Sequence, residues 1–169
     1  SEEKFRSLAE NSQDYIMRYD EQGRHLYQNQ AAYRVSGYSE EEFIGKTHKE
    51  LGFDKKLCDL WEKRITEVFH TGKPSGEVFN WEGNEGMVYL DWRVFPEFDK
   101  EGNVKTALGV SRDISEIKQS EAKIKASLNE KETLLHEIHH RVKNNMNDVS
   151  SHPKLQSNSI KDDQIKDVL

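Results

Sequence analysis

The sequence predicts an α+β domain, with a five-stranded antiparallel sheet and helices on one face, followed by a long C-terminal helix. Two short alternating segments precede a block of short helices, and three longer alternating segments follow it. No glycine occurs after Gly109, whereas glycines punctuate the chain before it. Beyond Asp113, apolar residues recur at steps of three and four, which is the period of a helix with one apolar face.

The first half of the domain is predicted to contain two helices and two short strands, besides a block of short helices. A helix is expected at residues 2–9, strands at 15–19 and 26–28, and the strongest helix at 54–70, ended by Gly72. The apolar stripe of that helix consists of Leu57, Leu60, Trp61, Ile65, Val68 and Phe69. A stripe this wide predicts that the helix packs on the sheet.

The second half is predicted to contain three strands, at residues 77–81, 87–95 and 104–111, with turns at 83–86 and 99–103. The middle strand alternates most clearly, because four apolar residues share one of its faces. These four are Val88, Leu90, Trp92 and Val94. The three strands complete the five-stranded sheet.

Three segments carry a resemblance to a known family. They are residues 27–32 (Tyr-Gln-Asn-Gln-Ala-Ala), 36–46 (Ser-Gly-Tyr-Ser-Glu-Glu-Glu-Phe-Ile-Gly-Lys) and 109–116 (Gly-Val-Ser-Arg-Asp-Ile-Ser-Glu). Together with the order of elements, they resemble a PAS sensor domain, which we assign to residues 1–112. In PAS domains such segments mark the architecture of the fold and not a ligand, so the resemblance implies a sensor without naming its signal.

The segment 113–133 is predicted to be a coiled-coil-like signalling helix. Asp113 is expected to cap it, with Glu116 as the partner in a capping box. Its apolar positions continue into the next segment as Ile114, Ile117, Ile124, Leu128, Leu135, Ile138, Val142 and Val149, with gaps at Glu121, Lys131 and Asn145. Such an imperfect heptad is typical of a parallel helix that dimerises weakly. We expect Asp113 and Ile114 to transmit the signal from the sheet into this helix.

The remaining segment, 134–169, begins with Leu-Leu-His-Glu-Ile-His-His-Arg-Val-Lys-Asn-Asn. It resembles the phosphoacceptor box of sensor histidine kinases, and more narrowly the group whose box reads His-Arg-x-Lys-Asn. The matching residues are His140, Arg141, Val142, Lys143 and Asn144. The heptad register places His140 on the outward side and His139 at the flank of the apolar face, so His140 is the first choice of acceptor and His139 the second. A neutral, exposed imidazole is a good nucleophile near neutral pH.

The resemblance implies the sensor portion of a two-component histidine kinase. His140 would receive the γ-phosphoryl group of Mg-ATP from a catalytic domain, its own or supplied in trans, and pass it to a response regulator. The chain contains no glycine-rich segment that could hold ATP, so we expect it to bind no cofactor and to be inactive as an enzyme by itself. The small ligand of the sensor, if there is one, is left unknown.

A second hypothesis is a PAS-based dimerisation or interaction module with an inactive histidine box. It is favoured by Asn147, Asp148, His152 and Pro153, which stand where the family would continue with apolar residues. A proline inside a helix costs about 3 kcal/mol. The helix is therefore predicted to be disrupted near Pro153, and the chain to be a weak homodimer or a monomer.

Other sites are weaker candidates. His70, near the end of the long helix of the domain, could ligate haem, although capping the helix end is its commoner role. His136 with His139 or His140 has the spacing of a metal pair, but we expect no metal because no thiolate accompanies them. Cys58 lacks the sequence context of a flavin photosensor.

The composition bears on nucleic-acid binding, cellular location and membrane segments. A net charge of −6 argues against nucleic-acid binding. The single cysteine fits a reducing compartment, and we expect a cytoplasmic location. No apolar run approaches the roughly 20 residues that span a bilayer, so no membrane segment is expected in this chain.

Overall fold

The computed structural model describes residues 1–84 and 86–166, with side chains up to residue 150. The chain divides into two units, of which the first is Ser1–Lys118 and the second begins at Gln119. The first unit holds a five-stranded antiparallel sheet in the order β2-β1-β5-β4-β3. Its strands are β1 (Tyr15–Tyr19), β2 (His25–Gln28), β3 (Ser75–Gly83), β4 (Gly86–Phe98) and β5 (Val104–Asp113). The predicted fold class is therefore confirmed.

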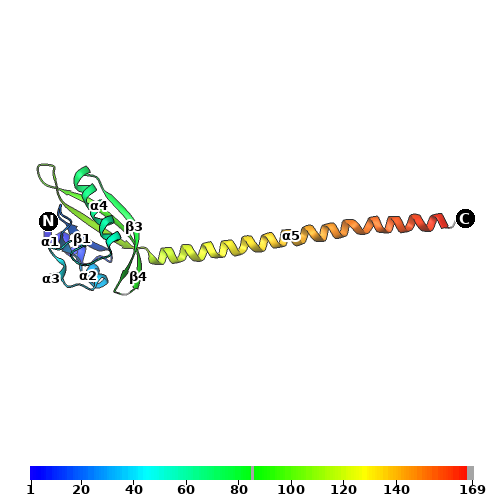
Figure 1. Ribbon diagram of the computed structural model, residues 1–169, viewed down its shortest axis with the longest axis horizontal. Helices are drawn as coiled ribbons and strands as arrows, with labels where there is room; N and C mark the ends of the chain where they lie inside the picture. Colours follow the sequence, from blue (N-terminus) through cyan, green and yellow to red (C-terminus); the bar gives the residue numbers. More distant parts are fainter. Residues whose placement is uncertain (85, 167–169) are drawn as a thin grey trace. The chain divides into compact units, whose positions relative to one another are not determined.

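Four helices complete the first unit, namely α1 (Glu2–Glu10), α2 (Gln30–Ser36), α3 (Glu40–Phe43) and α4 (Lys55–Thr71). Helix α4 packs against β3, β4 and β5 (Figure 1). Each of the last three begins at a side chain that accepts a backbone N–H of its first turn, from Asn29, Ser39 and Asp54 respectively. The local sequence thus fixes where these helices start.

The core lies between α4 and the inner face of the sheet. Its buried members are Tyr19, Trp61, Ile65, Val68, Trp92, Val94 and Ala107. Gly109 in β5 is needed there, because a Cβ at this position would lie 2.8 Å from the ring of Tyr19 and 2.9 Å from Nε1 of Trp92. The rings of Tyr19 and Trp92 therefore pack directly on the backbone of Gly109.

The junction after the sheet differs from the prediction. Strand β5 continues to Asp113, which pairs with Leu90, and helix α5 begins only at Ser115. The expected capping box between Asp113 and Glu116 does not form in the described residues 113–116. Instead, the Asp113 carboxylate accepts the N–H of Ser115 at 2.8 Å. Asp113 does not cap the helix as predicted, because its pairing with Leu90 of β4 holds it in extended backbone.

Strand β4 holds the start of α5 through two further bonds. The N–H of Ile114 donates to the carbonyl of Tyr89 at 2.8 Å. The N–H of Tyr89 donates to Oγ of Ser115 at 2.9 Å. Asp113 and Ile114, the predicted transmission residues, thus lie at the place where the sheet and the helix are directly bonded.

Helix α5 covers Ser115–Lys166 and joins the predicted segments 113–133 and 134–169 into one continuous helix. It passes through Pro153, so the predicted disruption near Pro153 is wrong. A proline removes one backbone hydrogen bond and strains one turn, a local cost that a long helix can carry. The side chains of His152 and Pro153, and residues 167–169 of the predicted segment, lie outside the described part.

Candidate phosphoacceptor site and central cavity

The predicted phosphoacceptor box lies on α5, and its side chains are exposed. Nδ1 of His140 lies 3.4 Å from Nδ2 of Asn144, one helical turn later. Arg141 forms an ion pair with Glu137, one turn earlier. The helix therefore brings together residues that are four apart, which leaves the imidazole of His140 held on one side and open to solvent on the other.

His139 and His140 have different surroundings. His139 borders a shallow hollow on the helix together with Val142, Lys143 and Met146, whereas His140 does not. Neighbouring residues of a helix lie about 100° apart around its axis, so the two side chains have partly different surroundings. Both side chains are exposed, so the choice of His140 over His139 as acceptor stays a prediction.

The apolar stripe of α5 has no cover within the described chain. Its exposed members are Ile117, Ile124, Leu128, Leu134, Leu135, Ile138, Val142, Met146 and Val149. A helix that leaves such a stripe exposed over eight or nine turns gains little from the hydrophobic effect as a monomer. The stripe therefore has the character of a helix–helix contact surface.

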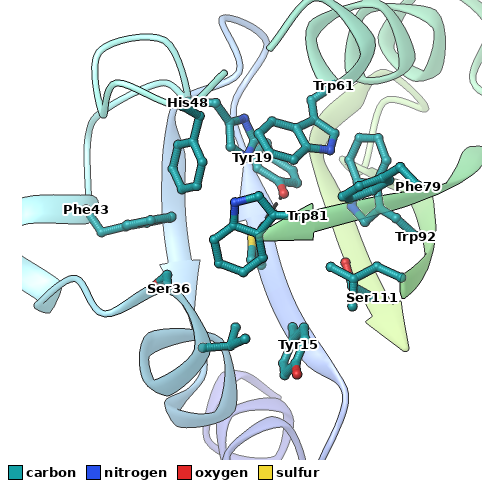
Figure 2. A pocket seen from close by; sticks show the side chains of 14 residues that line it. Tyr15, Tyr19, Ser36, Phe43, His48, Trp61, Phe79, Trp81, Trp92 and Ser111 are labelled. Carbon is teal, nitrogen blue, oxygen red and sulfur yellow. Dashed lines mark hydrogen bonds between the residues drawn. The ribbon is translucent and has the colours of Figure 1, made fainter. Parts of the chain in front are cut away.

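A second candidate site is a partly open cavity of about 40 Å³ in the first unit (Figure 2). It is lined by Tyr15, Met17, Tyr19, Val35, Ser36, Phe43, His48, Phe53, Trp61, Phe79, Trp81, Leu90, Trp92 and Ser111. None of these side chains is an acid, a lysine or an arginine. The cavity can therefore hold an uncharged group more easily than an ion.

Two buried histidines form a pair, of which His48 lines the cavity and His25 lies behind it, and sequence reasoning missed both. Nε2 of His25 and Nε2 of His48 are 3.2 Å apart, and Nδ1 of His25 lies 2.7 Å from the carbonyl of Lys46. Burial lowers the pKa of His25 to about 4. Burial, and then the neighbouring His25, hold the pKa of His48 well below its usual range. Both rings are therefore neutral at pH 7, and no local pattern in the sequence signals a pair that is 23 residues apart.

The weaker candidates lie elsewhere. His70 is exposed at the end of α4, where its Nδ1 bonds the carbonyl of Thr66 at 2.9 Å, and it does not line the central cavity. Cys58 is buried, and burial raises the pKa of its thiol. Among the described residues no group of three or more histidines, cysteines or acids could hold a metal ion. Nor does any described helix have the length and apolar character needed to cross a membrane.

Comparison with protein families gives two matches. The first is the family described as PAS fold, which matches residues 9–119. The chain belongs to this family. The second, described as histidine kinase, matches residues 137–169. The chain thus consists of a PAS domain followed by a histidine kinase segment, as the sequence predicts. The second match includes His139 and His140 but not His136.

Solved structures support the fold. The PAS domain of Bordetella pertussis BvgS is 23% identical, with a TM-score of 0.58 over 74% of this chain and 96% of that chain. A PAS domain from Colwellia psychrerythraea is 19% identical, with a TM-score of 0.56 over 69% of this chain and 99% of that one. The Vibrio cholerae VqmA dimer is 18% identical, with a TM-score of 0.59 over 69% of this chain.

At these identities the structural likeness shows the fold alone. The chain spans 52% to 57% of the length of two VqmA structures that it matches. No curated protein matches the chain.

Proposed function

We propose that this chain is the sensor and phosphoacceptor portion of a two-component histidine kinase and that His140 is the acceptor. The observation that carries the proposal is the exposed His140 within the segment that matches the histidine kinase family. The hypothesis of a pure interaction module is not favoured, because that match covers the box itself.

Asn144 can orient His140 for attack. An amide that turns its Oδ1 toward Nδ1 accepts the Nδ1–H, and Nε2 then keeps its lone pair; the two ends of an amide have nearly the same shape, so either can face the ring. Nε2 would attack the γ-phosphorus of Mg-ATP, the bond to the bridging oxygen would break, and ADP would leave. The ring then carries a positive charge, which the bond from Nδ1–H to Oδ1 stabilises.

The box cations have a supporting role in this proposal. Lys143 and Arg141 lie within one turn of His140, and both can reduce the repulsion between the acceptor helix and the phosphates of the approaching nucleotide. The ATP-binding domain, in cis or in trans, would supply the Mg-ATP. The phosphohistidine would then pass its phosphoryl group to an aspartate on a response regulator.

The acceptor is tested with labelled ATP and the separately expressed catalytic domain of the intact kinase. His140→Ala should abolish acid-labile labelling, because the nucleophile is lost. His139→Ala should keep part of it, and His136→Ala, one turn away on the same helix, should keep all of it. Asn144→Ala should slow labelling more than it reduces the final amount. Full labelling of the His140→Ala protein would contradict the assignment.

A second copy of this chain is the proposed partner of the apolar stripe on α5. The stripe has imperfect heptad spacing and three polar gaps, so we expect association to be weak. Sedimentation at a series of concentrations measures this directly. Ile138→Asp should weaken association at least tenfold, because it places a charge in the contact. An equally strong dimer in that variant would show that the stripe is not the interface.

A further inference from the structure

Arg141, the residue after the proposed acceptor His140, is bonded to a carboxylate on its own helix. Its Nη2 donates to Oε1 of Glu137, one turn earlier, and the two side chains form an ion pair. The side chains of Arg141 and Glu137 are 75% and 53% exposed, so solvent and a second protein domain can reach both. In the described helix, Arg141 is therefore held by Glu137 and not by the acceptor.

This ion pair is weak enough for Arg141 to change its partner. An ion pair between exposed side chains four residues apart contributes less than the thermal energy, because water screens both charges. The bond to Glu137 uses Nη2, which leaves the other N–H groups of the guanidinium for a further partner. A phosphoryl group carries more charge than a carboxylate, and its oxygens match the planar fork of a guanidinium. Arg141 therefore loses little by leaving Glu137 and gains more when a phosphoryl group arrives.

The position of Arg141 on the helix lets its side chain reach the reacting group. Successive residues of a helix turn by about 100°, so Glu137, Arg141 and Asn144 all lie on the same side of His140. The Cα atoms of His140 and Arg141 are about 3.8 Å apart, and an arginine side chain is longer than a histidine side chain. The guanidinium can therefore reach the oxygens of a phosphoryl group that approaches Nε2 of His140.

Lys143, the other cation of the box, has different surroundings. It borders the shallow hollow that also includes Val142 of the apolar stripe. The residues one turn before and after it are not acidic, namely His139, His140, Met146 and Asn147. Its ammonium group is a point charge without the fork of a guanidinium. Lys143 can therefore attract phosphates in general, whereas Arg141 has the geometry to bind one phosphoryl group.

We propose that Arg141 exchanges Glu137 for the γ-phosphoryl group of Mg-ATP and binds this group while Nε2 of His140 attacks it. This inference rests on the proposed function of His140. Arg141 is then a catalytic residue, because it touches the group that is transferred, and Glu137 is a positioning residue that holds Arg141 between reactions. Arg141 stays protonated throughout. The bond from Nε2 to the γ-phosphorus forms, the bond to the bridging oxygen breaks, and the guanidinium matches the charge on the phosphoryl oxygens.

The initial rate of labelling at a series of Mg-ATP concentrations tests this exchange, with the separately expressed catalytic domain of the intact kinase. Arg141→Lys keeps the charge but loses the fork, so the maximal rate should fall about tenfold. The KM for Mg-ATP should change little, because the catalytic domain binds the nucleotide. The helix content measured by circular dichroism should stay the same. An equal maximal rate in Arg141→Lys and in the wild-type chain would overturn the inference.

Glu137→Gln should change the rate in the opposite direction. It removes the resting partner of Arg141, so the rate should rise about two- to threefold, which corresponds to the strength of such an ion pair. The rise should vanish when Arg141→Gln is also present, because no guanidinium is left to release. Glu132→Gln removes another exposed carboxylate of the same helix and should leave the rate unchanged. If Glu137→Gln restores full labelling to Arg141→Gln, Arg141 only neutralises Glu137, and the exchange is disproved.

The His140→Ala variant separates this inference from the proposed function. Labelling that is lost in His140→Ala but unaffected by the changes at Arg141 and Glu137 supports the acceptor and overturns the exchange. Full labelling of His140→Ala overturns the proposed function, and the exchange with it. Labelling that is lost in His140→Ala, slower in Arg141→Lys and faster in Glu137→Gln supports both.

Discussion

Apolar residues on helices are buried in the PAS unit but exposed on helix α5. Ile65 on α4 is 2% exposed in the core, whereas Ile124 on α5 is 69% exposed. Both belong to apolar stripes at helical spacing, so the spacing of apolar residues in the sequence does not distinguish them. The first stripe is covered by the sheet of its own chain, and the second has no cover in the described chain. An apolar stripe in the sequence therefore predicts that a helix has a contact surface. It does not predict whether the same chain or another molecule covers that surface.

The histidines of the two regions differ in burial in the same way. His25 and His48 are buried in the PAS unit and bonded to one another, whereas His136, His139 and His140 lie exposed on α5. Burial keeps the first two neutral, and exposure leaves the ring of His140 available to a second protein domain. The same side chain serves structure in one unit and, in our proposal, chemistry in the other.

The largest expected effect comes from a matched pair of isoleucines. Ile65→Ala should lower the free energy of unfolding of the PAS unit by about 2–5 kcal/mol, because it leaves a cavity in the core. Ile124→Ala should change it by less than about 0.5 kcal/mol. Urea denaturation followed by circular dichroism and tryptophan fluorescence measures both. Similar losses in the two variants would mean that α5 is packed as tightly as the core.

An intermediate loss of folding stability is expected when the pH is lowered. Because the unfolded chain takes up protons on histidine near pH 6.5, while folded His25 does so only near pH 4, the unfolded state binds more protons in between. Stability is therefore complete above about pH 6.5 and falls as the pH drops toward 4. The loss from His25 is about 3 kcal/mol over that window, and His48 acts in the same direction.

Urea denaturation of the PAS unit at pH 7.0, 6.0 and 5.5 tests this acid effect. His48→Phe should reduce the slope of stability with pH, because one buried group no longer titrates. His70→Gln, which changes an exposed histidine, should keep the slope of the wild-type chain. If His70→Gln flattens the slope as much as His48→Phe does, the buried pair is not its source.

The smallest expected effect concerns the junction of the two regions. Ser115→Ala removes the acceptor of the Tyr89 N–H and should cost about 1 kcal/mol. Ser120→Ala, five residues later on the exposed helix, should cost nothing, because alanine favours a helix more than serine. Equal stability of the two variants would show that water replaces the bond from Ser115 without loss.

Local sequence determined much of this protein. Alternation predicted the five strands, and the side chains of Asn29, Ser39 and Asp54 cap three helices at their starts. These features depend on residues within about one turn of one another, so they can be read without a fold. The same local reasoning went wrong at Pro153 and at the cap of Asp113, where a long helix and a sheet ladder override a local preference.

Tertiary structure alone decided the contacts between residues that are distant in sequence. The pair of His25 and His48, the contact of Trp81 with Phe53 and the bond from Tyr89 to Ser115 each join segments that the chain separates by 20 residues or more. Such contacts exist only after the register of the sheet and the position of α4 are set. Their free energy comes from burial and from hydrogen bonds between elements, which no single segment contains. For that reason the phosphoacceptor box can be found in the sequence, whereas the aromatic cavity cannot.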